Sequence, residues 1–391
     1  MSLPYSRMTQ RLASPESDVW QVHEEAMARR SRGEDVTILS LGDPDFATPD
    51  FIAQHTVACI RQGRTHYSPP AGEDALRQAI AELESNLSGR RFEPEQFVIL
   101  PGATAALYAL FACLLDPGDE VIVPEPMYIG YRGVFAAIGA ELKLVSLKLP
   151  DFELSTADVF AAVTDKTRAV LVNTPGNPCG NILAPELLRE LAAGCRQRDL
   201  WFVCDEVYSL ITFDTPHVSA LRVTDDLSNV VVVDGLSKSH AMSGWRVGWI
   251  VAPPELVNEL VRFSSAAFFG VCQFVQDGAA HALANDAPDV EQMRIEYGKR
   301  RDYAVKRLEA IPELGFFRPA AGMFIMVDGS EVANDGVDFA RRLLDEAAIS
   351  TIPGRGFGPT SASFIRMSLT QPLDVLETVF DRLAKLARSA R

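Results

Sequence analysis

The sequence has few cysteines and histidines, and it lacks the groupings that would give them a structural role. The six cysteines are scattered, none forms a C-x-x-C pair, and no histidine accompanies a cysteine at the spacing of zinc ligands. These absences argue against a zinc site and against a disulfide framework. They favour a reducing compartment, the cytoplasm, and we expect no bound metal.

Long hydrophobic runs are absent as well. No stretch approaches the ~18 to 20 apolar residues that a membrane-spanning helix needs. The first 20 residues also lack the positive cluster and apolar core of a secretory signal. We therefore expect no membrane partner.

The third absence is a concentrated block of basic residues. Lysine and arginine number 37 against 52 aspartates and glutamates, so the net charge is −15, and the acidic residues are spread along the chain. Nucleic-acid binding requires a concentrated positive surface, so we expect no nucleic-acid partner. Small anions would have to be held by individual arginines, for which Arg246 and Arg366 are candidates.

Short apolar runs recur between residues 97 and 251, with the sequences FVIL, EVIVP, LKLVSL, AVLVN, WFVCD, NVVVVD and GWIVA. Helical patterns such as ATAALYALFACLL separate several of them. Continuous β-branched runs that alternate with helices favour an α/β fold with a mostly parallel sheet covered on both faces. In such sheets, ligand groups gather at the carboxyl ends of the strands.

The pattern changes after a long charged helix that we expect at about residues 288–310. The next segments are GMFIMVD, the helical FARRLLDEAA, and the strands ISTIPG and SFIRMSL. This order is typical of a smaller α+β domain. A length of 391 residues is also enough for about two or three domains.

One lysine, Lys238, follows a strand that is too apolar to lie outside a sheet. Ser237 precedes it in the polar turn, and Arg246 follows eight residues later. A lysine at the mouth of a buried strand loses hydration, so its neutral amine becomes more accessible, as Schiff-base chemistry requires. Most lysines in loops are exposed to solvent and have no catalytic role. Whether Lys238 is an exception has to be judged from the motifs around it.

Three motifs occur in a fixed order around this lysine. They are N-x-P-x-N-P-x-G at residues 173–180, D-E-x-Y at 205–208, and S-K-x-x-x-x-x-G-W-R-x-G at 237–248. Together they resemble the class I/II aminotransferases, fold type I enzymes that use pyridoxal 5′-phosphate (PLP). The resemblance extends from residue 39 to about residue 368.

The resemblance implies a three-layer αβα fold of type I, with a mostly parallel seven-stranded sheet and a smaller α+β domain. It assigns residues 46–287 to the large PLP-binding domain and residues 288–391 to the small one. The N-terminal segment, residues 1–45, would pack with the small domain. The active site would lie between the domains and across the interface of a homodimer.

The resemblance also assigns the residues that would hold the reactive part of the cofactor. Lys238 would bind PLP covalently and then move the α-proton of the substrate. Asp205 would pair with the pyridine nitrogen and keep the ring protonated, which makes it an electron sink. Asn177 and Tyr208 would donate hydrogen bonds to the phenolic oxygen.

The segment LPGATAAL, residues 100–107, matches the phosphate cradle of the family. A strand ends, Gly102 makes the turn, and a helix opens at Ala103 and Thr104, so free N–H groups and the helix dipole favour an anion there. By the same resemblance, Arg246 would supply the positive charge and Ser237 a hydroxyl.

Three further positions match the family. Tyr128 would stack on the pyridine ring, with Tyr131 as the alternative. Arg366, an arginine inside an apolar strand, would be costly without an anionic partner, and it matches the arginine that binds the substrate carboxylate. Gly42 resembles the glycine whose backbone closes over the same carboxylate, and the resemblance implies that Asn177 contacts the substrate as well.

Two positions bear on the phosphate site in other ways. The family often carries a second serine three residues before the lysine, and Gly235 stands there, so one phosphate contact is absent or made by water. Tyr67 resembles the tyrosine that reaches the phosphate of the neighbouring subunit. It is the residue that makes us expect shared active sites.

The motifs specify the cofactor more tightly than the outcome. We expect ping-pong transfer of an amino group from an L-amino acid to a 2-oxo acid such as pyruvate or 2-oxoglutarate; the alternative is a PLP-dependent β-lyase or another eliminating enzyme. Several stretches, SKSHAMSGWRVGW among them, are most similar to bacterial arginine–pyruvate transaminases and less closely to aspartate/aromatic aminotransferases. An arginine donor would need an acidic or hydroxylated pocket, for which the sequence offers Asp43, Asp45 and Glu125.

Overall fold

The computed structural model describes residues 4–13, 19–285 and 287–389. The apolar runs between residues 97 and 251 form its seven-stranded sheet, in the order β2-β8-β7-β6-β5-β3-β4. Only β8 runs antiparallel to its neighbours, so the prediction of a mostly parallel sheet is confirmed. The strands are β2 (Phe97–Leu100), β3 (Glu120–Glu125), β4 (Glu141–Ser146), β5 (Thr167–Asn173), β6 (Trp201–Asp205), β7 (Val230–Gly235) and β8 (Gly248–Val251).

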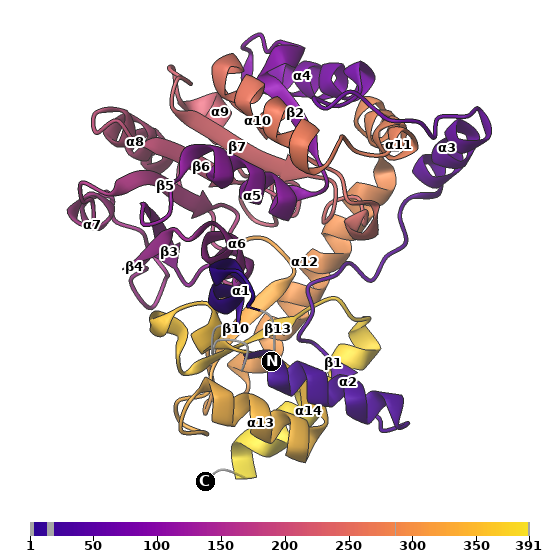
Figure 1. Ribbon diagram of the computed structural model, residues 1–391. Coiled ribbons are helices and arrows are strands. Elements are labelled where there is room, and N and C mark those ends of the chain that lie inside the picture. The colour runs from indigo at the N-terminus through magenta and orange to yellow at the C-terminus, as the bar shows by residue number, and fades with distance from the viewer. Residues whose placement is uncertain (1–3, 14–18, 286, 390–391) are drawn as a thin grey trace.

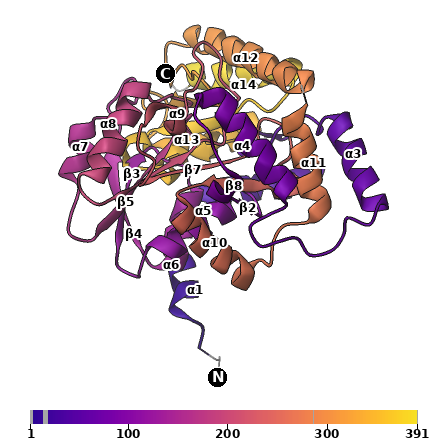
Figure 2. The same ribbon diagram turned by 90° about the horizontal axis from the view of Figure 1, so that it is seen from above.

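Helices cover both faces of this sheet, which makes the large domain a three-layer αβα structure (Figure 2). The alternation within β7 shows why: Val230 and Val232 face one core cluster, and Val231 and Val233 face the other. A strand that is buried on both faces has to be apolar at every position. One face carries α5 (Ala103–Leu114), α6 (Gly130–Ile138) and α10 (Pro254–Ala267). The other carries α4 (Asp74–Ser88), α7 (Thr156–Ala161), α8 (Pro185–Arg196), α9 (Ala220–Val223) and α11 (Gln273–Ala284), with α3 (Asp50–Arg61) beside α11.

The small domain lies below the large one in Figure 1 and is built on a four-stranded antiparallel sheet of order β12-β13-β10-β9. A separate core cluster joins this sheet to its helices. The strands are β9 (Gly315–Phe317), β10 (Phe324–Asp328), β12 (Ile352–Pro353) and β13 (Phe364–Ser368). The helices are α12 (Pro288–Glu309), α13 (Gly336–Ala347) and α14 (Leu373–Ser389).

The N-terminal segment divides between the two domains. Helix α2 (Gln21–Ser31) and β1 (Thr37–Ile38) join the small-domain core, where β1 pairs in parallel with β11 (Ile349–Ser350). Helix α1 (Arg7–Leu12) instead lies against α6 (Figure 2), where Arg11 donates to the carbonyl oxygens of Ala136 and Ala137 at 2.6 and 2.9 Å. The domain limits at residues 45 and 287 stay predictions, and parts of the predicted segments (residues 1–3, 14–18, 286 and 390–391) lie outside the described residues.

Two ion pairs link α12 to other parts of the chain, and one of them crosses to the large domain. Arg300 contacts Asp45 at 2.8 Å, and Arg301, which is almost fully buried, contacts Asp214 of the large domain at 2.7 Å. The charged residues of α12 are therefore not all exposed to solvent. Arg301 holds the small domain against the large one.

The carboxyl ends of β5, β6 and β7 lie side by side at that edge. Asn173 is paired in register with Asp205, and Asp205 with Val233, five residues before Lys238. The polar residues that end these strands are thus brought together by the sheet itself, as the sequence predicted. Among the described helices, none is long and apolar enough to cross a membrane.

Candidate active site

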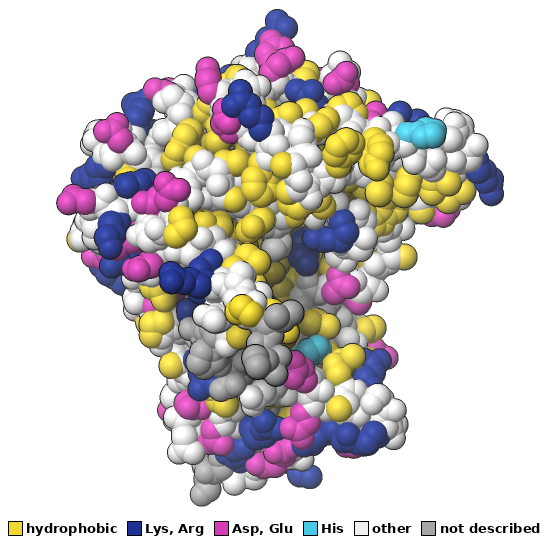
Figure 3. Space-filling model, in the orientation of Figure 1, with side chains coloured by type: hydrophobic (Ala, Val, Ile, Leu, Met, Phe, Trp, Pro, Cys, Tyr) yellow, Lys and Arg dark blue, Asp and Glu magenta, His cyan; other side chains and the backbone are white. Residues whose placement is uncertain are grey.

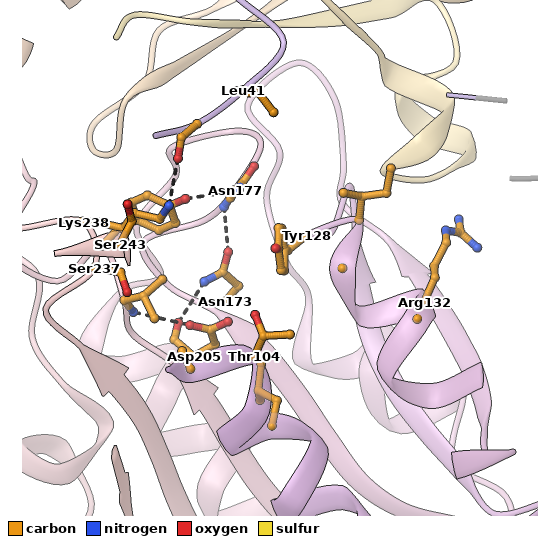
Figure 4. A pocket seen from close by; sticks show the side chains of 18 of the residues that line it. Leu41, Thr104, Tyr128, Arg132, Asn173, Asn177, Asp205, Ser237, Lys238 and Ser243 are labelled. Carbon is orange, nitrogen blue, oxygen red and sulfur yellow. Dashed lines mark hydrogen bonds between the residues drawn. The ribbon is translucent and has the colours of Figure 1, made fainter. Parts of the chain in front are cut away.

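A cavity of about 800 Å³ lies between the carboxyl edge of the large sheet and the small domain. Its lining includes the end of helix α1, the segment at Gly42, the start of α5, helix α6, the ends of β5, β6 and β7, and Phe324 and Arg366 of the small domain. Figure 4 shows Lys238, Asn177, Tyr128, Thr104 and Asp205 together in this space. Eleven of the twelve predicted site residues line the cavity, and Tyr67 is the exception.

The amine of Lys238 lies in the turn after β7. Its Nζ donates a hydrogen bond to the carbonyl oxygen of Gly42 at 2.8 Å. Burial lowers the pKa of Lys238, and the nearby cations Arg366 and Arg246 lower it further, although Asp43 acts in the opposite direction. The amine therefore loses its proton more readily than an exposed lysine, which is what a Schiff-base nucleophile needs.

Asp205 is buried at the end of β6 with a single close donor to its carboxylate. Tyr131 donates from its hydroxyl to Oδ2 at 2.6 Å, while the N–H of Val207 lies 3.4 Å from Oδ1. Burial raises the pKa of Asp205 to about 6, although the hydrogen bond from Tyr131 opposes this. Within the part of the chain that the structure describes, no cation pairs with this carboxylate, so a protonated ring nitrogen would complete it.

Asn177 and Tyr208 are linked side by side in the cavity wall. Asn177 donates from Nδ2 to the Tyr208 hydroxyl at 3.2 Å, and its backbone N–H donates to Oδ1 of Asn173 at 2.7 Å. Both Asn177 and Tyr208 are buried, and burial raises the pKa of the Tyr208 phenol. Tyr208 thus stays a neutral donor, as its predicted role requires.

The two tyrosines of the VPEPMYIGY segment have different places. Tyr128 faces the cavity, and the absence of a side chain at Gly130 makes room for its ring, because a Cβ there would lie 2.5 Å from Cε1. Tyr131 packs edge-on against Tyr128, with ring centroids 5.4 Å apart, and reaches Asp205 instead. Tyr128 therefore remains the predicted stacking residue, and Tyr131 acts behind it.

The predicted phosphate cradle has the expected form. Helix α5 begins after Gly102, whose φ is +87°, and no side chain caps its first turn. A Cβ at Gly102 would lie 2.5 Å from Nη2 of Arg246, so the glycine allows the guanidinium to approach the helix start. Ala103, Thr104 and Ser237 line the same corner. Free N–H groups beside a guanidinium make a site for an anion such as phosphate.

Gly235, which stands where the family often has serine, has no room for a side chain. It pairs with Gly248 of β8, and a Cβ would lie 2.9 Å from the carbonyl oxygen of Val247 and 3.1 Å from Cα of Gly248. The close approach of β8 therefore explains the glycine.

Arg366 is a buried guanidinium in the middle of β13. It donates from Nη1 to Oδ1 of Asn177 at 3.1 Å and from Nη2 to the carbonyl oxygen of Ser40 at 2.7 Å, and its Nε has no partner among the described residues. The group stacks on Phe324, 4.2 Å from the ring centroid. Burial lowers the pKa of Arg366 to about 10.

No carboxylate in the described ranges lies within ion-pair distance of Arg366, so the guanidinium is a buried charge with only neutral acceptors. Such a group suits the carboxylate of a bound substrate, which can accept two parallel hydrogen bonds. Gly42 lies at the same corner, where a Cβ would meet the Phe324 ring at 2.3 Å.

Tyr67 lies outside the cavity of its own chain. It is 81% exposed and packs edge-on against Phe269, which is itself 55% exposed. Its loop is held in place by the buried Gln276, which accepts from the N–H of Glu73 at 2.7 Å and donates to Oγ of Ser68 at 3.1 Å. The role of Tyr67 in a neighbouring subunit stays a prediction.

The three acidic residues predicted to contact the basic side chain of the substrate have other partners or lie outside the cavity. Asp45 pairs with Arg300, Asp43 accepts from Ser243 at 2.5 Å, and Glu125 is fully buried outside the cavity. None of the three lines the cavity.

Sequence reasoning missed four contributions to the site. Asn173, at the end of β5, is the first residue of the N-x-P-x-N-P-x-G motif, and this position could have indicated that it lies in the site. The hydrogen bond from Tyr131 to Asp205 and the contacts of Ser40 and Phe324 with Arg366 join distant parts of the chain and required the fold.

Comparison with known proteins identifies the family. The model of "Aminotransferase class I and II" matches residues 34–383. The chain belongs to the class I and II aminotransferases. It is 42% identical over 384 residues to the arginine–pyruvate transaminase AruH of Pseudomonas aeruginosa, covering 98% of each chain.

Aspartate aminotransferases are also among the relatives. That of Geobacillus stearothermophilus is 31% identical over 96% of this chain and 98% of its own. The solved structure of the Thermus thermophilus aspartate aminotransferase with maleate matches with a TM-score of 0.93 at 31% identity, over 98% of this chain and all of that one. The fold is therefore that of fold type I, as predicted, and PLP is the cofactor of this family.

The residues of this aminotransferase fit PLP. A buried carboxylate without a cation, a helix start with an adjoining guanidinium, and a buried amine with a lowered pKa lie in one cavity. Each of these groups has the charge or the polarity that one part of the cofactor needs.

The raised pKa of Asp205 makes a prediction about stability. Its pKa is about 6 in the folded protein against an ordinary value of 3.8. In the cofactor-free protein, folding is therefore disfavoured progressively as pH rises from about 4 to about 6, by roughly 2 to 3 kcal/mol. Urea unfolding of wild type and Asp205→Asn across this range should show that the variant lacks this part of the loss.

The same measurement tests Tyr131. Tyr131→Phe removes a hydrogen bond to the ionised carboxylate, so the pKa of Asp205 should rise and the loss of stability should extend to higher pH. Other buried acids, Glu84 and Asp234, shift in the same direction. The comparison with Asp205→Asn isolates the contribution of Asp205. Identical pH profiles for the three proteins would contradict the assignment.

Proposed function

We propose that this aminotransferase binds PLP at Lys238 and transfers the amino group of an L-amino acid to a 2-oxo acid by a ping-pong cycle. The observation that carries the proposal is Arg366, a buried guanidinium without an anionic partner in the described part of the chain. It opens into the same cavity as the buried amine of Lys238. A carboxylate bound at one and a nitrogen bound at the other would define an α-amino acid.

Arg366 would bind the substrate carboxylate through its guanidinium, with Asn177 and the carbonyl oxygen of Ser40 keeping that group in its plane. The Phe324 ring beneath it excludes water from one side. A charge-assisted pair in this environment is stronger than one in solvent. This contact would fix the α-carbon with respect to Lys238.

Lys238 would then take and return the α-proton at its Nζ. The lowered pKa of its amine makes a neutral base accessible, and the hydrogen bond to Gly42 aims the nitrogen. When bound, PLP supplies a protonated ring that withdraws electrons from the α-carbon. Asp205 would hold the proton on the ring nitrogen, because ionisation of the buried carboxylate is favoured by an adjacent positive charge.

The choice of transfer over elimination is supported by the relatives, which are named aminotransferases. Arginine enters as a donor through the name of the Pseudomonas aeruginosa relative, and aspartate through the others. Pyruvate and 2-oxoglutarate are the proposed acceptors. The three acidic residues predicted to contact a cationic substrate side chain, Asp43, Asp45 and Glu125, do not line the cavity. The contacts predicted for the guanidinium of an arginine donor are therefore not present in the described residues.

We further propose that the enzyme is a homodimer in the cytoplasm. Hydrophobic side chains gather at the upper right of Figure 3, over α10, α11 and α3. Val57 and Ile60 of α3, and the contacting pair Tyr67 and Phe269 in the loops that follow α3 and α10, are each exposed by 43% or more. Such a face suits contact with a second copy of the chain. All six cysteines are unpaired, which fits a reducing compartment.

Single-turnover chemistry tests the function. The PLP-loaded protein should release one equivalent of 2-oxo acid per site from a donor alone, and continue only after pyruvate or 2-oxoglutarate is added. A donor panel of arginine, lysine, aspartate, alanine and phenylalanine should identify the substrate. In Lys238→Ala, the control, transfer should fall by about three orders of magnitude or more because nucleophile and base are lost together. Ammonia released without an acceptor would establish an eliminating enzyme instead.

Hybrid dimers test the shared site. A Tyr67→Phe chain combined with a Lys238→Ala chain gives, if Tyr67 acts across the interface, one intact site with the Lys238 of the first chain and the Tyr67 of the second. Its affinity for PLP should equal that of wild type, whereas the Tyr67→Phe homodimer should bind PLP roughly tenfold more weakly. A hybrid that keeps the weak affinity, or an enzyme that sediments as an active monomer, would refute the arrangement.

A further inference from the structure

Glu125 is a fully buried carboxylate with no cation beside it in the described ranges. It ends β3, and its side chain accepts three hydrogen bonds. The hydroxyl groups of Ser146 and Thr360 donate to Oε1 at 2.6 and 2.5 Å, and the N–H of Thr360 donates to Oε2 at 3.1 Å. Ser146 belongs to the large domain, while Thr360 lies in the small-domain turn, residues 354–363, that joins β12 to β13. The carboxylate therefore joins the two domains.

This turn is shaped around the carboxylate. Gly358 has a φ of +146°, and a Cβ there would lie 2.1 Å from Oε2 of Glu125. The hydroxyl of Ser361 braces the turn from inside, donating to the carbonyl oxygen of Gly354 at 2.8 Å. A side chain at position 358 would push the turn off the carboxylate, so the close approach depends on glycine.

The segments on either side of this contact carry ligand-facing side chains. On the large-domain side, Tyr128 lies three residues after Glu125, and the N–H of Met127 donates to the carbonyl oxygen of Phe357 at 2.8 Å. On the small-domain side, the turn leads directly into β13 and Arg366. Tyr128 and Arg366 both line the cavity.

Oε1 of Glu125 accepts from both domains at once, from Ser146 and from Thr360, while Oε2 accepts from the backbone of Thr360, and an apolar side chain could accept none of these bonds. A buried carboxylate is costly unless its acceptors are used, and here three donors satisfy it. The arrangement therefore ties the turn to the large domain through Glu125, and the turn connects directly to β13, the strand that carries Arg366.

We propose that Glu125 is a positioning residue that fixes Arg366 of the small domain relative to Tyr128 of the large domain. It acts through the turn and not by contact with a ligand, which corrects its expected role as a reader of the substrate side chain. The proposal rests on the proposed function only in the identity of the carboxylate that Arg366 holds.

The chain offers a matched pair of variants. Thr360→Val and Ser146→Ala each remove one hydroxyl donor to the same oxygen, but only the first bond crosses between the domains. Thr360→Val should raise the KM of the amino donor and the Kd of 4-methylpentanoate, an amino-free carboxylate, about tenfold, with kcat and PLP affinity within about twofold of wild type. Ser146→Ala should lose similar stability with KM within about twofold, and Thr360→Ser should restore the wild-type KM.

Hydrogen exchange separates a failure of this proposal from a failure of the proposed function. In Thr360→Val, amides at residues 354–361 and 125–132 should both exchange faster, whether or not any donor reacts. Thr360→Ala removes the same hydroxyl if the valine variant does not fold. The proposal would be overturned if the faster amide exchange in Thr360→Val were confined to residues 354–361. It would also be overturned if the Thr360 and Ser146 variants changed the Kd of 4-methylpentanoate equally. An enzyme that binds 4-methylpentanoate as expected but transfers no amino group would overturn the function alone.

Discussion

The uncompensated guanidinium of Arg366 is the constraint on which the rest of the site depends. A charge inside an apolar strand is expensive, and among the described residues two neutral oxygens accept hydrogen bonds from this guanidinium while two aromatic rings lie against it. The fold keeps this charge dry by docking the small domain over the carboxyl edge of the large sheet. The ion pair of Arg301 in α12 with Asp214 of the large domain contributes to the same docking.

Three ionisable groups in the cavity are shifted by the same cause. Burial raises the pKa of Asp205 and lowers the pKa of both Lys238 and Arg366, so the charged form of each group is less favoured here than in solvent. A cofactor with a protonated ring nitrogen and a substrate with a carboxylate would bring the opposite charges. The site is thus organised for its ligands at the expense of the free protein, as active sites commonly are.

Much of this organisation could be predicted from the sequence, because it depends on local patterns. The valines of β7, buried on both faces, place Lys238 at a strand end, and the ordered motifs bring Asn177, Asp205 and Tyr208 to the same edge. The contacts that could not be predicted join residues far apart in the chain. Tyr131 reaches Asp205 across 74 positions and Thr360 reaches Glu125 across 235, and neither pair has a local pattern that indicates its partner. The same limit made Glu125 look like a substrate contact.

If Arg366 binds the carboxylate of the substrate, the thermal stability of the protein must depend on a carboxylate ligand through this residue. Thermal unfolding in the presence of such a ligand is the most direct test. The Tm of the PLP-loaded wild type should rise with the concentration of 4-methylpentanoate, because a ligand that binds only the folded state stabilises it. Arg366→Met keeps the size and removes the charge, and its Tm should not change with the ligand. Arg262→Met, at an exposed surface pair with Glu259, should respond as wild type does. A Tm that rises equally in Arg366→Met would mean that another group binds the carboxylate, and the account would be wrong.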